Sequence, residues 1–252
     1  MSAQTVGDGS GADPEIVLSM RDVSKAYGDG DGRVHALRRV SLDVAAGEMV
    51  AVMGTSGSGK STLLSIAGAM VTPDAGEVTV AGVPIEGASA RGRARVRREL
   101  VGFVFQDFNL IPALTVIENV ALPLDLDGAS RATARSEARR ALAAVGMRER
   151  GKDFPDDLSG GQRQRVAIAR AMVGQRRLVL ADEPTGALDS VTGDRVLSVL
   201  RSMADQGSAV VLVTHDARHA AWADRIVHLA DGTILEEARA ARPEQLLTGE
   251  PR

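Results

Sequence analysis

The 252-residue chain has no cysteine, very few aromatic residues and no long apolar run. Without cysteine it can form neither a disulfide nor a thiolate metal site, which fits a reducing compartment without proving one. Its apolar runs, such as Ala209–Val213, are far shorter than the roughly twenty residues that a membrane-spanning helix needs. We therefore expect a chain that does not cross a membrane, with the cytosol as its default location.

Strong charge of one sign is also missing. The formal net charge is −3, with 44% hydrophobic and 25% charged residues, which is typical of a globular protein and offers no general attraction to nucleic acid. Residues 91–98 contain five arginines, but no aromatic side chain that could stack on a base lies among them. We interpret this segment as the solvated face of a short helix leading into a strand over 101–105, and we expect no nucleic-acid partner.

Both ends of the chain have the composition of tails. Residues 1–14 are rich in glycine, aspartate and serine, with neither a basic start nor an apolar stretch. This pattern predicts a disordered tail and no signal peptide. Residues 238–252 are similarly polar and are predicted to form a second tail. The part between them, 15–237, is long enough for one large or two small domains.

The hydrophobic pattern of this central part predicts an α/β fold. Strand-like runs separated by Gly/Asp turns indicate a small antiparallel layer, and they cover 16–20, 34–44 and 77–80. Later apolar strands alternate with helices, which indicates a buried, largely parallel sheet. These later elements are strands 178–181 and 209–213, a helix over 192–205, and paired strands 226–229 and 233–236. A mainly helical region, 107–157, interrupts this core, with its most regular helix over 131–145.

A nucleotide-binding pattern follows the apolar run Met49–Met53. The pattern G-x-x-x-x-G-K-[ST] is matched by Gly54, Thr55, Ser56, Gly57, Ser58, Gly59, Lys60 and Ser61. Glycines let successive backbone N–H groups point at the β- and γ-phosphates, and the helix opening at Lys60 adds the positive end of its dipole. The alternative is a Gly/Ser-rich turn that binds nothing. We expect this helix to end near Gly76, and the loop alone leaves open what the nucleotide is used for.

A second glycine-rich helix start and two polar strand ends add to this pattern. Leu158 is followed by Ser159, Gly160, Gly161 and Gln162, which open a helix whose N-terminus is a second phosphate-binding end. The strand over 178–181 ends in Asp182 and Glu183. One carboxylate there can hold a Mg²⁺ shell while its neighbour activates water. The strand over 209–213 is followed by Thr214 and then by His215.

Together these motifs resemble those of the ATP-binding cassette family over about residues 16–236. In chain order, the matching residues are Tyr27, 54–62, Gln106, 158–162, Asp182, Glu183, Ala187, Leu188, Asp189 and His215. The resemblance implies a RecA-like P-loop NTPase core with an antiparallel β subdomain. It also implies an inserted helical subdomain at about 107–165, all within an ATP-binding domain that spans 15–237.

The resemblance further implies ATP and Mg²⁺ as cofactors and a role for each matching residue. The expected Mg²⁺ ligands are Ser61, Gln106 and Asp182. The expected catalytic residues are Glu183 as general base, His215 at the γ-phosphate, Gln106 at the attacking water and Lys60 at the phosphates. Further ATP contacts are expected from Tyr27 stacked on adenine and from Thr62, Ser159, Gly160, Gly161, Gln162 and Asp189. Because Glu183 and His215 are both present, we expect real ATP hydrolysis.

Family resemblance also implies the partners. Two copies are expected to close head to tail, so that each ATP lies between the phosphate loop of one copy and residues 159–162 of the other. The membrane-embedded permease is expected on a separate polypeptide, which would hold this chain on the cytoplasmic face of the membrane. Segments 105–112, 115–123 and 181–189 are similar to the group containing macrolide-export, lipoprotein-release and cell-division ATPases.

Three questions stay open at this point. One alternative function is an ATPase that regulates extracytoplasmic enzymes through a membrane partner without transport. Another is a soluble, non-transport cassette ATPase, which the lack of a second cassette, a coiled coil or a basic face disfavours. The apolar residues after Gln106 either receive a coupling helix of the permease or belong to the core, and they are Phe108, Leu110, Ile111 and Leu114. The cargo and the direction of transport are not encoded in any motif of the chain.

Overall fold

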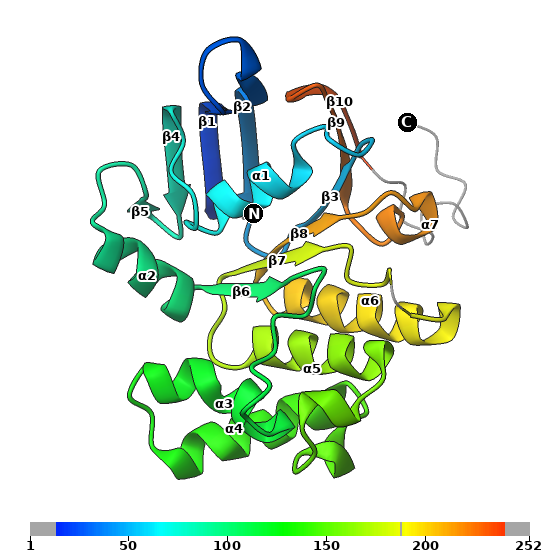
Figure 1. Cartoon of the computed structure of the whole chain (residues 1–252). Helices are drawn as coiled ribbons and strands as arrows, with labels where there is room; N and C mark the ends of the chain where they lie inside the picture. The colour runs from blue at the N-terminus through cyan, green and yellow to red at the C-terminus, as the bar shows by residue number, and fades with distance from the viewer. Residues whose placement is uncertain (1–13, 187, 240–252) are drawn as a thin grey trace, which may run out of the picture.

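A computed structural model describes residues 14–186 and 188–239, which form two sheets with helices around them (Figure 1). The first is a four-stranded antiparallel sheet in the order β2-β1-β4-β5. Its strands are β1 (Ile16–Tyr27), β2 (Val34–Ala45), β4 (Ala75–Val80) and β5 (Val83–Pro84). This confirms the predicted antiparallel layer. β1 runs beyond the predicted 16–20 because it passes through irregular pairing near Asp22, whose φ of 48° kinks the strand without ending it.

The second sheet has six strands in the order β10-β9-β3-β8-β7-β6. Strands β9, β3, β8, β7 and β6 are parallel, and β10 is antiparallel to β9. Their bounds are β3 (Met49–Met53), β6 (Val101–Val104), β7 (Leu178–Asp182), β8 (Ala209–Val213), β9 (Arg225–Ala230) and β10 (Thr233–Arg239). β8 is buried along its whole length, as expected for an apolar strand covered on both faces.

Alternate residues of these strands enter two separate cores. Val211 and Val213 pack with helix α1 (Lys60–Ala67) and the antiparallel sheet on one face. Val210 and Leu212 pack with helices α5 (Gly160–Met172) and α6 (Ser190–Asp205) on the other face. In Figure 1, α1 accordingly lies above β6, β7 and β8, and α5 and α6 lie below them. The two glycine-rich helix starts therefore belong to opposite faces of one sheet.

Helices α3 (Val116–Leu126), α4 (Arg131–Ala144) and α5 pack against one another and form the helical region predicted between the strands. The regular helix predicted over 131–145 is present, because Ser130 caps it and Gly146 follows its end with a φ of 68°. The remaining helices and turns are η1 (Gly30–Gly32), α2 (Ala90–Glu99), η2 (Arg148–Arg150), η3 (Pro155–Asp157) and α7 (Ala217–Ala220). In the part of the chain that the structure describes, no helix is long and apolar enough to cross a membrane.

The helix after the phosphate loop was predicted to end near Gly76, and this is wrong. α1 ends at Ala67, and Ala69 has a φ of 55° that cannot continue a helix. A Cβ atom on Gly68 would lie 3.1 Å from a Leu180 side-chain atom, so the helix end packs closely against β7. This contact stops the helix, although its apolar spacing continues to Met70.

The chain ends also differ from the predicted boundaries. β10 runs to Arg239, two residues past the predicted domain end at 237, because it still pairs with β9 there. Arg225 of β9 also forms an ion pair with Glu237 at 2.6 Å. Of the predicted tails 1–14 and 238–252, residues 1–13 and 240–252 lie outside the described residues.

Candidate nucleotide site

The loop between β3 and α1 has a backbone that only glycine permits at two positions. Gly59 has a φ of 106°, and a Cβ atom there would lie 2.3 Å from the carbonyl oxygen of Ala36. A Cβ atom on Gly54 would lie 2.1 Å from the carbonyl oxygen of Leu229. Neither backbone neighbour can move aside easily, so these glycines hold the loop close to β2 and β9.

The polar groups of this loop differ in their partners and in their exposure to solvent. The Lys60 Nζ atom donates hydrogen bonds to the carbonyl oxygens of Gly54, at 2.9 Å, and Thr55, at 2.7 Å. Its charge therefore lies over the loop itself. Ser58 is buried, and its hydroxyl has no hydrogen-bond partner among the described residues. The exposed residues of the loop are Thr55, Ser56, Gly57 and Ser61, and Thr62 is half-buried.

The start of α1 is joined to the end of β7. The Ser61 hydroxyl donates a hydrogen bond of 3.1 Å to Oδ2 of Asp182. Burial raises the pKa of Asp182, and the nearby Glu183 adds to this rise, whereas the Ser61 hydrogen bond opposes it. A hydroxyl and a carboxylate thus lie side by side. Both are oxygen donors of the kind that Mg²⁺ prefers.

Glu183 and His215 meet across the ends of β7 and β8. His215 Nδ1 lies 2.7 Å from Glu183 Oε1, which is a hydrogen-bond distance. This hydrogen bond, together with the charge of Glu183, raises the pKa of His215. Glu183 has a φ of 45°, an unfavourable value for a residue with a side chain, and its N–H donates to the carbonyl of Val213 at 3.0 Å. Such strained residues often cluster at functional sites.

Gln106 and Tyr27 stand at two further strand ends. Gln106 is exposed and follows β6, which pairs with β7 as far as Val104 and Ala181. It therefore leaves the sheet on the strand next to Asp182. Tyr27 ends β1 with 45% of its surface exposed, and the Lys25 ammonium lies 5.7 Å from its ring.

The second predicted helix start is well capped. The Ser159 hydroxyl accepts a hydrogen bond from the Gln162 N–H, and the Ser159 N–H donates to Gln162 Oε1 at 2.8 Å. This reciprocal pair orders the start of α5, where Gly160 and Gly161 are the first helical residues. Because α5 packs on the face opposite to α1, the structure does not group these residues with the phosphate loop of the same chain.

Asp189 has a defined local role. Its carboxylate accepts hydrogen bonds from the Thr192 N–H, at 3.0 Å, and from the Thr192 hydroxyl, at 2.8 Å. These bonds cap α6 and lower the pKa of Asp189. The side chain is exposed at the surface. Ala187, two residues earlier, lies outside the described residues.

The apolar residues after Gln106 divide between core and surface. Leu110 packs against the core formed with the helical region, whereas Ile111 is 40% exposed. Phe108 and Asn109 both have positive φ values, 60° and 46°, and Arg170 of α5 donates hydrogen bonds to both of their carbonyl oxygens. Arg170 was not among the predicted site residues. No pattern marks it, because its partners are backbone atoms 61 and 62 residues away.

Three more polar residues, Thr185, His219 and Asn119, were not among the predicted site residues. Thr185 Oγ1 and His219 Nδ1 lie 3.0 Å apart, immediately beyond the Glu183–His215 pair. Asn119 is fully buried and binds the segment after Gln106 through four hydrogen bonds. A lone histidine in a short helix and an asparagine inside an apolar helix carry no recognisable motif.

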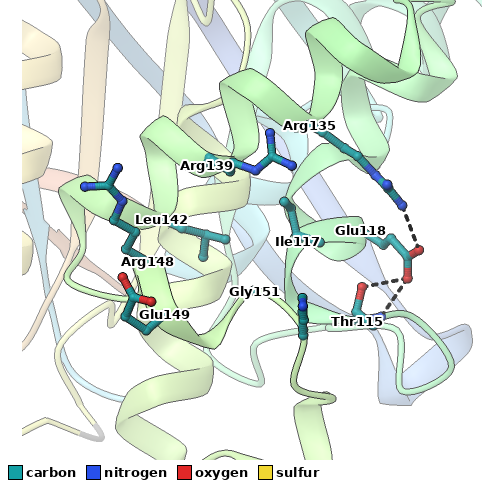
Figure 2. A pocket seen from close by; sticks show the side chains of 10 residues that line it. Thr115, Ile117, Glu118, Arg135, Arg139, Leu142, Arg148, Glu149 and Gly151 are labelled. Carbon is teal, nitrogen blue, oxygen red and sulfur yellow. Dashed lines mark hydrogen bonds and ion pairs between the residues drawn. The ribbon is translucent and has the colours of Figure 1, made fainter.

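A separate hollow of about 610 Å³ lies on the helical region (Figure 2). Its lining includes Thr115, Arg135 and Arg148, and none of the predicted site residues borders it. Figure 2 shows Glu118 bonded to Thr115 and paired with Arg135. This hollow is therefore distinct from the strand ends that carry the predicted nucleotide site.

A phosphate loop, a strained acid and a histidine at one sheet edge define a nucleotide-hydrolysing P-loop protein. The model for the family described as ABC transporter matches residues 37–186, and the chain belongs to this family. It is an ABC ATPase of the LolD and MacB type, and its RecA-like α/β fold class is as predicted.

Two similar proteins indicate how far the likeness in sequence extends. The lipoprotein-releasing system ATP-binding protein LolD of Shewanella sp. (strain MR-4) is 44% identical over 229 residues, which cover 90% of this chain and 99% of LolD. The macrolide export ATP-binding/permease protein MacB of Shigella flexneri is 43% identical over 89% of this chain, which spans only 35% of MacB.

Among solved structures, the ATP-binding cassette MJ0796 is similar along nearly its whole length. In its dimeric post-hydrolysis state bound to ADP and Pi, it has 40% identity and a TM-score of 0.85, covering 89% of this chain and 99% of MJ0796.

Proposed function

We propose that this chain is the ATP-hydrolysing subunit of a transporter and that two copies close head to tail around two ATP molecules. One observation supports the proposed dimer: the helices that start at Lys60 and at Gly160 pack on opposite faces of one sheet. The N-terminus of a helix suits a phosphate, because its first N–H groups point toward the ligand and the helix dipole favours negative charge. Since the sheet separates the two helix starts within one chain, the second helix start serves a nucleotide held by another copy.

Within each site, the loop residues 54–62 hold the phosphates, and Lys60 turns its ammonium from the loop carbonyls toward them. Tyr27 offers an exposed ring to the adenine. The helix start of the other copy closes over the γ-phosphate and consists of Ser159, Gly160, Gly161 and Gln162. Asp189 lies at the contact between the two copies.

Mg²⁺ fits the donor set of this site. Ser61 and Asp182 present neighbouring oxygen atoms, and Gln106 leaves the sheet on the adjacent strand. No group of three or more His, Asp or Glu side chains is poised to bind a metal in residues 14–186 and 188–239, so phosphate and water would supply the other ligands. When bound, Mg²⁺ would neutralise charge that develops on the phosphates.

Hydrolysis in this proposal depends on Glu183 and His215. Glu183 accepts the proton of the attacking water, because its carboxylate lies at the strand end next to the phosphate loop. His215 is 76% exposed at its side chain, so it can leave Glu183 and contact the γ-phosphate. Gln106 orients the water.

A separate permease is the proposed partner, with the chain on the cytoplasmic side of the membrane beneath it. Two likenesses support this: the match over nearly all of LolD, named an ATP-binding protein of a system, and MacB, named both ATP-binding and permease. Purification of the chain from membranes and sequencing of the bound polypeptide tests the partner. Recovery of a polypeptide with membrane spans supports it, and recovery of the chain alone contradicts it.

Mixing two inactive variants tests the head-to-tail arrangement. Lys60→Ala disables the phosphate loop, and Gly160→Glu places a negative charge at the start of α5, where a Cβ atom meets open space. Each variant alone has two defective sites in a head-to-tail dimer. A mixed dimer has one site with both defects and one intact site, so mixing restores ATPase activity. Sites built from a single chain would give no recovery, and that result would contradict the proposed dimer.

A further inference from the structure

The ends of β7 and β8 are joined by a second side-chain link, between Thr185 and His219. Thr185 Oγ1 lies 3.0 Å from His219 Nδ1, and Thr185 is only 5% exposed. The His219 side chain is 18% exposed, and its Nε2 lies 3.9 Å from Oδ2 of Asp216. This link is therefore shielded from solvent, unlike the exposed His215 side chain.

The second link runs parallel to the first. Thr185 follows Glu183 by two residues, and His219 follows His215 by four, so both hydrogen bonds connect the same two segments. The backbone ladder of β7 and β8 ends where the Glu183 N–H bonds to Val213. Beyond that point, within the described residues, these two side-chain bonds join the segments directly.

The Thr185 position affects the backbone on both sides of it. The Gly186 N–H donates to the carbonyl of Glu183 at 3.1 Å, and the Leu188 N–H donates to the carbonyl of Thr185 at 3.0 Å. A Cβ atom on Gly193 of α6 would lie 3.6 Å from the Thr185 Cγ2 atom, so the threonine methyl group faces α6. Thr185 is thus enclosed between α6 and α7, and a shift of its side chain moves the turn that begins at Glu183.

We propose that His219 is a positioning residue for ATP hydrolysis. It holds Thr185, and Thr185 holds the strained backbone that aims the Glu183 carboxylate. While ATP is bound and His215 turns toward the γ-phosphate, the Glu183–His215 bond is lost. Among the side-chain bonds of the described residues, the buried Thr185–His219 link then still joins the two segments beyond the strand ladder. His219 itself touches neither ATP nor Mg²⁺. This inference rests on the proposed role of Glu183.

The two nitrogen atoms of histidine allow a sharp test. An asparagine side chain places an amide group near the position of Nδ1, whereas a glutamine side chain reaches toward the position of Nε2. Thr185 needs a partner at the Nδ1 position. His219→Asn should therefore preserve the link, because an amide group can either donate to the Thr185 hydroxyl or accept from it. His219→Gln should break the link. Thr185→Val removes the hydroxyl with little change in shape, and Thr185→Ser keeps it.

Steady-state ATPase assays of the purified chain measure the effect. We expect His219→Gln and Thr185→Val to lower kcat about tenfold, because a small displacement of a catalytic group is costly, while KM for ATP changes less than about twofold. His219→Asn and Thr185→Ser should retain kcat within about twofold. The double variant with His219→Gln and Thr185→Val should be no slower than either single variant, because both substitutions remove the same hydrogen bond. His228→Gln, an exposed histidine on β9, is the matched control.

Several outcomes would overturn the inference. One is an unchanged kcat in Thr185→Val, and another is an equal loss of kcat in His219→Asn and His219→Gln. A third is a double variant whose loss of kcat equals the product of the losses in the two single variants. Because Thr185→Val is nearly isosteric, it keeps the test decisive if His219→Gln fails to fold. If Glu183→Gln itself retains turnover, the proposed function fails. If Glu183→Gln loses turnover and Thr185→Val does not, only the role of His219 fails.

Discussion

Replacing Asn119 by alanine is expected to destabilise the segment that joins Gln106 to α3. Asn119 is fully buried, and its side chain uses every group it has. Oδ1 accepts a hydrogen bond from the Ile111 N–H at 2.7 Å. Nδ2 donates to the carbonyls of Ile111 and Leu114 at 3.0 Å and to that of Thr115 at 3.2 Å. One side chain therefore supplies backbone hydrogen bonds to a segment that is neither helix nor strand.

The expected cost follows from the groups left without a partner. The Thr115 carbonyl also accepts the N–H of Asn119, and the Ile111 carbonyl also accepts the N–H of Leu114 at 3.1 Å, so each keeps one bond in the variant. Among the described residues, the Ile111 N–H and the Leu114 carbonyl have no printed partner other than Asn119, so these two groups lose their bonds. An unpaired buried polar group costs about 1–3 kcal/mol, and Ile111 is 40% exposed, so water relieves part of this cost. We take about 1 kcal/mol for each of the two groups, or about 2 kcal/mol in total.

Asn119→Asp refines the prediction, because aspartate keeps an acceptor for the Ile111 N–H but loses the donors. A carboxylate would then face the carbonyl oxygens of Ile111 and Leu114 in a buried place. We therefore expect Asn119→Asp to be at least as destabilising as Asn119→Ala at neutral pH.

Urea denaturation of both variants measures the free energy of unfolding, and amide hydrogen exchange measures the local effect. The Ile111 N–H should lose its protection in Asn119→Ala. Gln175→Ala, at an exposed position with no side-chain hydrogen bond in the described structure, is the control and should change stability by less than about 0.5 kcal/mol. A loss below about 1 kcal/mol for Asn119→Ala, with Ile111 still protected, would refute the reasoning.

Two further predictions concern Glu183. Glu183→Gln should bind ATP, lose at least about a hundredfold in turnover and accumulate as an ATP-bound dimer in light scattering, with exposed Glu149→Gln as control; turnover at the wild-type rate would contradict the assigned base. The pKa of His215, followed by NMR, should lie above its ordinary value of 6.5 in the chain without nucleotide and fall in Glu183→Gln. Because the folded-state pKa is raised, the stabilisation from this bond is complete below about pH 6.5 and is lost as pH rises through the raised value. An unchanged His215 titration in Glu183→Gln would show that another group causes the shift.

Elements with strong local signals were predictable from the sequence. The strand over 209–213 has the predicted bounds, and α4 differs from its prediction by one residue. Both have apolar patterns that agree with their final environment, with a cap or turn at their ends. α1 was misjudged because its end depends on the approach of Gly68 to Leu180, which is a contact between distant parts of the chain.

The same distinction holds for the site. The positions of Lys60, Asp182, Glu183 and His215 follow from motifs, because the carboxyl ends of parallel strands meet at one edge of a sheet. The contacts of Arg170 could not be predicted, since it binds carbonyl groups of a loop whose positive φ values arise only in the folded chain.

The amino-acid sequence by itself determined the family and the class of fold, and it predicts the residues of the nucleotide site. These depend on local spacing: glycines that allow a tight loop, and polar residues that follow apolar strands. Only the tertiary structure decided that the two glycine-rich helix starts lie on opposite faces of one sheet. It also decided that Thr185 and His219 reinforce the Glu183–His215 pair. The physical reason is that both arrangements depend on which distant segments pack together, and hydrophobic burial sets that packing without leaving a local pattern.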